Sequence, residues 1–332
     1  MTATNFYDVT LRDGNHALRH QLTPKFVREY CQLADSSGVW AVEVGHGNGL
    51  GASSFLVGKS STTDEGLLVA AREGLSNSKL AVHAIPGFAT IKRDIYPALE
   101  VGVEVFRVAT HVTEATVAQT HIEYLANRGA IVHGVLMMSH MTDIAGILEQ
   151  AKLMKKYGAS AVILMDSAGH FVPSDVADRV SALKGEIDLE VGFHAHNNLG
   201  VAISNAMIAV ENGASIVDGS SMGLGAGSGN AQLENIVANY GRAHLDGAKL
   251  REYLQMSRLV ENAFEDYLPR TNSSSVESGM AGVFSGYAPQ VKQISSEMGI
   301  EQEELWNEIG RRRLVAGQES MIREIAQDLM NL

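Results

Sequence analysis

One pattern recurs along this chain and constrains its fold more than any other feature. A segment with helical periodicity ends, a glycine follows, and a short run rich in β-branched residues begins. The pattern occurs at Gly38, Gly102, Gly129, Gly158 and Gly213. Glycine adopts the left-handed conformation that ends a helix at low steric cost, and the chain then enters a strand. The sequence therefore predicts a regular alternation of helices and strands.

The predicted strands are continuous apolar runs, which is typical of a parallel sheet covered by helices. We identify eight of them, at Asn5–Arg12, Ala41–Gly45, Leu80–Ile85, Val105–Ala109, Ile131–Met137, Ala161–Asp166, Glu190–His196 and Ile216–Ser220. Helices are expected in the gaps, for example at Lys25–Ser37, Thr142–Tyr157 and Ala202–Asn212. Alternation of this kind predicts an α/β fold, a (β/α)8 TIM barrel.

A doubly wound open sheet is the alternative fold. It would need a phosphate-type glycine loop after an early strand, and Gly45–Gly49 lacks the G-x-G-x-x-G spacing. We therefore expect residues 1–247 to form the catalytic barrel. Residues 248–332 are expected to form a helical C-terminal region that contacts a partner or a second copy and closes the pocket. Within this region, Glu277–Pro289 is a connector that contains glycine and serine.

Charge and cysteine content exclude several classes of protein. The net charge is −12 and the one basic run, Arg311–Arg313, fits a solvated or interface face, so nucleic-acid binding is not expected. The single cysteine, Cys31, rules out disulfides within the chain and a cysteine-based zinc site. The sequence shows neither a signal peptide nor an apolar stretch long enough for a membrane, so a cytoplasmic protein is expected.

Polar residues gather where four of the predicted strands end. These segments are Thr10–His16, Asp166–His170, His194–Asn198 and the glycine-rich Gly223–Asn230. In a TIM barrel the carboxyl ends of the strands form the face that carries the chemistry. The active site is therefore expected there. The glycine-rich segment either presents backbone N–H groups to an anion or forms a tight turn without a ligand.

His194 and His196 suggest a metal site. They are two residues apart on a strand, so both side chains project to the same side. Two imidazoles at a barrel mouth suit a divalent metal, and Asp13 from the first strand would complete the set. Hydrogen-bonded core histidines are the alternative. The residue types do not separate zinc, manganese and magnesium, but mixed nitrogen and oxygen ligands with open water positions favour manganese or another octahedral ion.

Two residues beside Asp13 are candidates for catalysis. The planar guanidinium of Arg12 suits a carboxylate or an enolate oxygen, and a structural ion pair is the alternative role. His16 follows one short turn later and could act as a general base, because imidazole titrates near neutrality. His20, His46, His111, His140 and His170 also follow strand ends and are expected to line the pocket or to satisfy loops.

Taken together, these segments resemble the 4-hydroxy-2-oxovalerate aldolase family. This family comprises class II pyruvate aldolases, in the larger group that also holds isopropylmalate synthase and hydroxymethylglutaryl-CoA lyase. The segments that carry the resemblance are Asp8–Gln21, Arg107–His111, Leu136–Met141, Val191–Leu199, Gly223–Asn230 and Gly310–Glu319. The likeness covers nearly the whole chain, and the first and fourth segments are specific in combination.

The resemblance implies a metal-dependent aldolase that acts on a 4-hydroxy-2-oxo acid and joins or separates pyruvate, as its enolate, and an aldehyde. Asp13, His194 and His196 would hold the metal, which would be Mn²⁺ or another divalent ion such as Mg²⁺, Co²⁺ or Zn²⁺. Arg12 would stabilise the pyruvate enolate, and His16 would remove the proton of the 4-hydroxyl group. The substrate would be bound by Arg12, His194 and Ser167, the last at the pyruvate carboxylate.

Two departures from the family pattern concern the substrate. The family usually has a tyrosine where this chain has Phe284, and that phenol helps to protonate or position the substrate. Water or a nearby group such as Tyr287 would substitute for it, or the reaction differs. The family also lines its aldehyde pocket with aliphatic side chains where this chain has His83. We therefore expect an aldehyde half that is larger or more polar than acetaldehyde.

Members of the family commonly pair with an acylating aldehyde dehydrogenase and act in aromatic hydrocarbon catabolism. A Gly-Gly pair lies near the passage between the two enzymes, and this chain reads Val315-Ala316-Gly317-Gln318 there. The resemblance thus makes an acylating aldehyde dehydrogenase a possible partner. The methyl group of Ala316 would narrow the passage and so hinder channelling between the two enzymes. A homo-oligomer is also expected.

Two rival functions remain open. One is a Claisen-type acyl-CoA lyase or synthase of the same superfamily. It is disfavoured because about 85 residues after the barrel leave no room for a regulatory domain, and Gly223–Asn230 contains no cysteine. The other is a non-catalytic subunit derived from an aldolase. It would show damage among the functional positions, yet Arg12, Asp13 and His16 are all intact.

Overall fold

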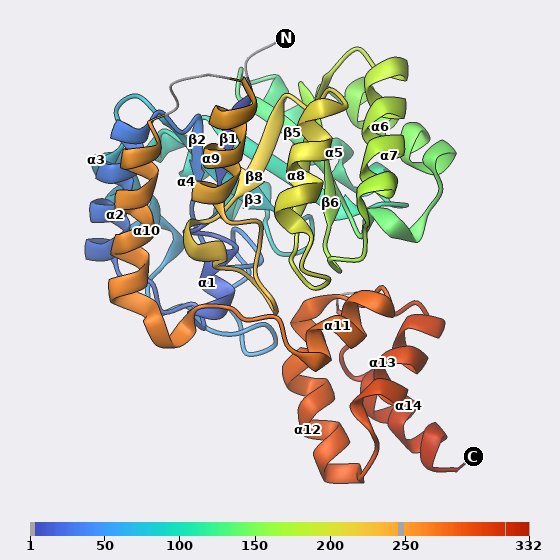
Figure 1. Ribbon diagram of the computed structural model, residues 1–332. Coiled ribbons are helices and arrows are strands. Elements are labelled where there is room, and N and C mark those ends of the chain that lie inside the picture. The colour runs from blue at the N-terminus through green and yellow to red at the C-terminus, as the bar shows by residue number, and fades with distance from the viewer. Residues whose placement is uncertain (1–3, 245–248, 316, 332) are drawn as a thin grey trace.

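The structure is a computed structural model that describes residues 4–244, 249–315 and 317–331. Eight parallel strands close into a barrel in chain order, and helices cover its outside, so the predicted TIM barrel is confirmed (Figure 1). The strands are β1 (Asn5–Asp8), β2 (Ala41–Glu43), β3 (Lys79–Ala84), β4 (Val105–His111), β5 (Ile131–Met137), β6 (Ala161–Asp166), β7 (Glu190–Ala195) and β8 (Ile216–Gly219).

Helices alternate with these strands. Those of the barrel are α1 (Gly14–Ala17), α2 (Pro24–Ser37), α3 (Asp64–Gly74), α4 (Tyr96–Val101), α5 (Gln119–Ala126), α6 (Ile144–Tyr157), α7 (Pro173–Glu186), α8 (Ala202–Glu211), α9 (Leu233–His244) and α10 (Leu250–Phe264). Short 3₁₀ turns lie at Ala115–Ala118, Ser139–Met141, Ser221–Gly223, Glu265–Tyr267 and Ser285–Tyr287, and a π-helical turn lies at Ile91–Ile95.

The recurring glycines take the conformation that the sequence predicted. Gly38, Gly102, Gly129, Gly158 and Gly213 all have positive φ, between 75° and 112°. At the other end of α2, the Thr23 hydroxyl accepts a hydrogen bond from the Phe26 backbone N–H at 3.3 Å, and proline stands at the first helical position. Start and stop signals therefore fix where the chain changes from helix to strand.

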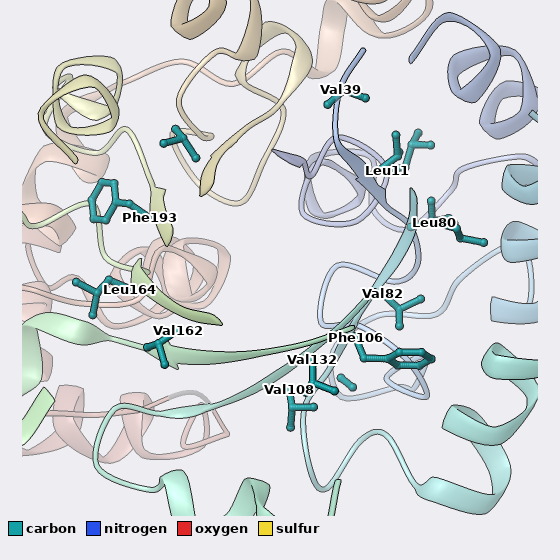
Figure 2. Close-up of a cluster of buried hydrophobic side chains, with 14 of the residues drawn as sticks. Leu11, Val39, Leu80, Val82, Phe106, Val108, Val132, Val162, Leu164 and Phe193 are labelled. Atoms are coloured by element: carbon teal, nitrogen blue, oxygen red, sulfur yellow. The ribbon is translucent and has the colours of Figure 1, made fainter. Parts of the chain in front are cut away.

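The strands are apolar throughout because both of their faces are buried. One set of side chains packs against the helices; it includes Leu80, Val82, Phe106, Val108 and Phe193, which Figure 2 shows pointing outward from the strands. The alternate set fills the barrel interior and includes Tyr7, Ala81, Val105, Val135 and Ile163. Any charged residue in this second set therefore lies inside the barrel.

Five strands, β1, β2, β3, β7 and β8, end earlier than the sequence predicted, and two of these ends, those of β1 and β7, lie at the metal-site candidates. β1 stops at Asp8, and Val9–Asp13 form turns in which the backbone N–H of Asp13 donates to the carbonyl of Val9 at 2.8 Å. β7 stops at Ala195, and His196 forms only an isolated bridge with Asn230. The metal-site candidates therefore lie at and just beyond strand ends, where loops can reach them.

The C-terminal helices form a second body below the barrel, coloured red in Figure 1. They are α11 (Ser273–Met280), α12 (Ala288–Met298), α13 (Gln302–Arg311) and α14 (Met321–Met330). Their own apolar cluster includes Val283, Trp306 and Ile325. Helix α10 packs on α2 of the barrel instead. The expected boundary between residues 247 and 248 lies outside the described residues and stays a prediction. Among the described helices, none is long and apolar enough to cross a membrane.

Candidate active site

A cavity of about 510 Å³ opens at the carboxyl ends of the strands. Polar side chains line it together with apolar side chains such as Ile85, Met165 and Phe284. The sequence-predicted residues that line it are Arg12, Asp13, His16, His83, Ser167, His196 and Phe284. We refer to it below as the site cavity.

Two buried residues that line this cavity, Asp13 and His196, form a potential metal-binding set with His194, which is buried beside them. One ligand atom from each of Asp13, His194 and His196 lies within 4.8 Å of the other two. The two Nε2 atoms are 3.3 Å apart, so both imidazoles aim at the same point. A buried carboxylate beside two imidazoles is a common ligand set for a catalytic divalent metal with open positions. The donor set therefore fits the expected metal.

Asp13 is held on both of its carboxylate oxygens. Oδ1 contacts Arg12 Nη1 at 2.7 Å, while Oδ2 accepts from the side-chain amide of Asn230 at 2.8 Å. Burial alone would raise the pKa of Asp13, but Arg12 and the neighbouring histidines outweigh it and hold the pKa well below its usual range. A Cβ on Gly225 would lie 2.7 Å from Oδ2, so no larger residue fits beside this carboxylate.

The two histidines differ in what holds them. His194 Nδ1 donates to Asp218 at 2.9 Å, which leaves Nε2 to face His196. His196 Nδ1 is buried and has no hydrogen-bond partner. Burial lowers the pKa of His196 to about 4, so its imidazole is neutral at pH 7 and its nitrogen lone pair is available to a metal.

Arg12 is fixed on one side and free on the other. Its Nε contacts Glu43 Oε1 at 2.5 Å, and its Nη1 donates to the Gly47 carbonyl at 3.1 Å as well as to Asp13. Its Nη2 is buried without a hydrogen-bond partner. An unsatisfied buried donor costs about 1–3 kcal/mol, and more when charged. This donor is therefore positioned for an oxygen that enters the cavity.

His16 approaches the cavity from α1. A Cβ on Gly47 would lie 2.5–2.6 Å from its ring, so a glycine is required for this close approach. Burial lowers the pKa of His16, with Asp13 acting in the opposite direction, so the imidazole is neutral at pH 7 and can accept a proton. Beside it, the rings of His20 and His46 stack with their centres 3.6 Å apart.

The other two expected contacts with substrate also line the site cavity. Ser167 Oγ accepts from the Met138 backbone N–H at 3.0 Å and keeps its own hydrogen to donate. His83 is 2% exposed, and its Nδ1 has no hydrogen-bond partner. Burial lowers the pKa of His83 to about 3, so it faces the cavity as a neutral polar group.

Phe284 and Tyr287 lie on different sides of the cavity wall. Phe284 lines the cavity, whereas Tyr287 is buried in the apolar cluster of the C-terminal helices. The Tyr287 hydroxyl donates to the backbone carbonyl of Val315. This placement is at odds with the expectation that Tyr287 binds substrate or replaces a missing phenol. Its aromatic ring packs instead in the apolar core of the C-terminal helices.

The C-terminal segment 275–285 is hydrogen-bonded to the mouth of the barrel by side chains that follow β5, β6 and β7. His140 donates to the Gly282 carbonyl at 2.9 Å, and His170 donates to the Gly279 carbonyl at 2.7 Å. Asn198, two residues past His196, bonds to Ser275, Ser278 and Ser285 at 2.9–3.2 Å. The wall that carries Phe284 is thereby joined to the strand ends.

Sequence reasoning missed four residues at this site. Asn230 lay inside a segment interpreted only for its glycines. Glu43, Arg107 and Asp218 are each a charged residue within an apolar strand run, and all three are buried inside the barrel. That isolated charge was the available signal, because a charge on a doubly buried strand must face the interior and find a partner there.

Comparisons with known proteins agree with this geometry. A family model described as HMGL-like matches residues 3–260, and one described as a DmpG-like communication domain matches residues 269–331. The chain is 48% identical to a 4-hydroxy-2-oxovalerate aldolase of Pectobacterium atrosepticum, across 97% of this chain and 94% of that protein. A 4-hydroxy-2-oxovalerate aldolase of Spirochaeta aurantia is 50% identical, across 97% and 95%.

Among solved structures, the carboxyl transferase domain of Rhizobium etli pyruvate carboxylase is similar, with a TM-score of 0.78 and 17% identity. The match covers 99% of this chain and 60% of that chain, and it shows a shared fold.

Proposed function

Because the chain belongs to the 4-hydroxy-2-oxovalerate aldolase family, we propose that it is a carbon–carbon lyase that cleaves a 4-hydroxy-2-oxo acid to pyruvate and an aldehyde. The observation that carries this proposal is the unpartnered Nη2 of Arg12, buried at the base of the site cavity beside Asp13, His194 and His196. A cationic donor and a metal-ligand set at one point suit a reaction in which an oxygen atom gains negative charge.

Asp13, His194 and His196 would hold the divalent metal. A bound ion would act as a Lewis acid that stabilises negative charge on the keto oxygen of the substrate. Manganese is our first choice because the ligand set mixes nitrogen with oxygen, and magnesium, cobalt and zinc are the other candidates.

The chain's own residues account for the remaining steps. His16 takes the proton from the hydroxyl group on C4 of the substrate, and the electron pair of that O–H bond forms the aldehyde C=O as the C3–C4 bond breaks. The electrons of the C3–C4 bond form the pyruvate enolate, whose oxygen accepts a hydrogen bond from Arg12 Nη2. Ser167 donates to the pyruvate carboxylate. A proton delivered to C3 then completes pyruvate.

The last proton has no phenol to supply it. Phe284 lines the site cavity without a hydroxyl group, and the Tyr287 hydroxyl is committed to the Val315 carbonyl. We therefore assign the protonation of C3 to His16, which carries the proton it took from the substrate hydroxyl, or to water. Either source keeps the overall reaction balanced, since cleavage neither releases nor consumes a proton.

We propose that the aldehyde half is larger or more polar than acetaldehyde. His83 supports this proposal, because its unpartnered Nδ1 is the kind of group that binds a hydroxyl group of a ligand. Several other lining residues, among them Leu56, Ile85 and Phe88, are apolar and would contact the carbon chain of the aldehyde.

We propose an acylating aldehyde dehydrogenase as the partner, with the match of residues 269–331 to a DmpG-like communication domain as support. Val315 and Gly317 line the site cavity, so the cavity extends toward the C-terminal helices. Ala316, which was expected to narrow the passage, lies outside the described residues. A homo-oligomer, a cytoplasmic location and a role in aromatic hydrocarbon catabolism stay predictions.

The test is pyruvate release from a panel of 4-hydroxy-2-oxo acids, measured with added Mn²⁺ and again after chelation. We expect release that requires the metal and is greatest for substrates with a polar or extended aldehyde half. No release from any substrate by protein with metal bound would contradict the proposal. Activity with acyl-CoA substrates, assayed separately, would favour the Claisen-type alternative, and inactivity toward both substrate classes would favour a non-catalytic subunit.

A further inference from the structure

A buried network of charged side chains lies inside the barrel beneath the site cavity. Arg107 on β4 is fully buried at its centre. Both of its terminal nitrogens contact the carboxylate of Asp218 on β8, with Nη2 at 2.8 Å from Oδ1. Its Nε lies 3.8 Å from Oε2 of Glu43 on β2, and its guanidinium carbon lies 3.3 Å from the ring centre of Tyr7.

Each of the two carboxylates continues to a different residue of the site. Asp218 Oδ2 accepts from Nδ1 of His194 at 2.9 Å. Glu43 Oε1 accepts from Nε of Arg12 at 2.5 Å, while its Oε2 accepts from the Tyr7 hydroxyl at 2.9 Å. One arginine that does not line the site cavity is thus two contacts away from a metal-ligand candidate and from the catalytic arginine.

We propose that Arg107 is a positioning residue that acts on two sides of the site. Through Asp218 it orients His194, and through Glu43 it orients Arg12. It thereby fixes the metal site and the enolate site relative to each other. The inference rests on the proposed function, because it concerns how that site is arranged.

The chemistry of each contact supports this role. An ionised Asp218 fixes the hydrogen of His194 on Nδ1, and the lone pair of Nε2 then faces the metal position. Arg107 compensates the charge of Asp218 with a two-pronged contact that a lysine cannot reproduce. Glu43 similarly fixes the rotation of the Arg12 guanidinium, so that Nη2 rather than another nitrogen faces the cavity.

The experiment compares purified full-length protein with Asp218→Asn, Glu43→Gln and Arg107→Lys. Mn²⁺ affinity of the metal-free proteins is measured by calorimetry, and kcat and KM are measured at saturating Mn²⁺. Asp218→Asn should weaken Mn²⁺ binding about 10–100-fold. Glu43→Gln should leave Mn²⁺ affinity within about threefold but lower kcat by about tenfold or more, as expected when an enolate donor is displaced. Arg107→Lys should show both defects.

Asp8→Asn is the matched control. Asp8 is a buried strand carboxylate like the others, but it bonds to Thr10 and Tyr30, and Tyr30 lies on helix α2. We expect it to lower the melting temperature without changing Mn²⁺ affinity or kcat. Thermal unfolding is recorded for every variant, so that a general loss of stability is separated from a specific loss of metal binding.

A second readout does not depend on catalysis. In protein labelled with ¹⁵N-histidine, His194 should show a hydrogen on Nδ1, and Asp218→Asn should remove that preference. Mn²⁺ affinity, kcat and histidine tautomer all unchanged in folded Asp218→Asn and Arg107→Lys would overturn the inference, as would losses no different from those of Asp8→Asn. Failure of the wild-type protein itself to bind Mn²⁺ or to release pyruvate would instead contradict the proposed function.

Discussion

The side-chain amide of Asn230 donates to Oδ2 of Asp13 at 2.8 Å, which joins the loop after β8 to the turn after β1. The same amide also donates to the Leu224 carbonyl at 2.8 Å. With Arg12 on its other oxygen, the Asp13 carboxylate has little freedom to rotate. The candidate metal site is therefore preorganised by contacts within the chain.

Replacement of Asp13 by alanine should abolish metal binding and activity together, because the single carboxylate of the ligand set is lost. His196→Ala should have the same effect. Metal content of the purified protein and pyruvate release are the two measurements. Asp166→Asn is the control: its buried carboxylate caps the backbone N–H groups of His170 and Phe171 and should retain metal. Full activity in Asp13→Ala would refute the metal assignment.

Arg12→Ala should retain the metal but lower kcat by about 10²–10³-fold, by analogy with the loss of one oxyanion donor. Arg12→Lys should recover little of this loss, since a lysine cannot contact Glu43, Asp13 and the enolate oxygen at once. The measurement is kcat at saturating Mn²⁺, with metal occupancy determined on the same samples. A lysine variant as active as the wild type would exclude a role for the forked geometry.

His16→Ala should slow cleavage by about 10²–10⁴-fold and change the dependence of kcat on pH. Burial lowers the pKa of His16 below 6.5, and a general base works only in its neutral form. Wild-type kcat should therefore fall on the acid side of that pKa, and this decline should disappear in the variant. The profile is corrected for metal occupancy at each pH, because protonation of His196 would release metal. An unchanged profile would remove His16 as the base.

His83→Leu should shift the substrate preference toward small apolar aldehyde halves, because it replaces a polar group in the site cavity with an aliphatic one of similar size. We expect kcat/KM for a hydroxylated aldehyde half to fall about tenfold relative to that for acetaldehyde, in line with the loss of one hydrogen bond to the substrate. Competition between the two aldehydes in the synthetic direction measures this ratio directly. Equal ratios in the two proteins would show that His83 does not select substrate.

His133 should make the metal-free protein sensitive to acid. It is fully buried, and its ring stacks on that of Trp40 with 5.6 Å between the ring centres. Neither of its ring nitrogens has a hydrogen-bond partner. Burial lowers its pKa from 6.5 to about 3. As pH falls below 6.5, His133 becomes protonated in the unfolded chain but stays neutral in the folded protein. The contribution of neutral His133 to the free energy of unfolding is therefore fully present above pH 6.5 and is lost as pH falls toward 3.

The measurement is urea unfolding of the wild type and His133→Phe between pH 7.5 and 4.5. The wild type should lose more stability than the variant, by about 1.4 kcal/mol for each pH unit below 6.5. Burial raises the pKa of Asp8 and Asp166 to about 6 and acts in the opposite direction, but both carboxylates are present in both proteins and cancel in the comparison. Parallel curves would contradict the prediction.

The barrel could be predicted from the sequence because its signals are local. Glycine caps and apolar runs are each recognisable within about a dozen residues. Asp13, His194 and His196 could be proposed as one candidate set because the strand ends of a barrel meet at one face, and the structure places the three side chains together. Asp218 and Arg107 could not be paired in this way, because their contact depends on closure of the sheet across the barrel. The packing of Tyr287 could not be predicted locally either, because its ring lies in the apolar cluster that Trp306 and other C-terminal residues form only after folding.

The fastening of segment 275–285 to His140, His170 and Asn198 has a consequence for how such proteins can be recombined. A barrel excised at the end of α10 would present two imidazoles and an amide whose partners had been removed, and its site cavity would lack the wall formed by Phe284. Chimeras that exchange the C-terminal helices between relatives should therefore carry these three residues along with their matching backbone carbonyls and serines. The barrel and its C-terminal helices are therefore structurally interdependent at the mouth of the site cavity.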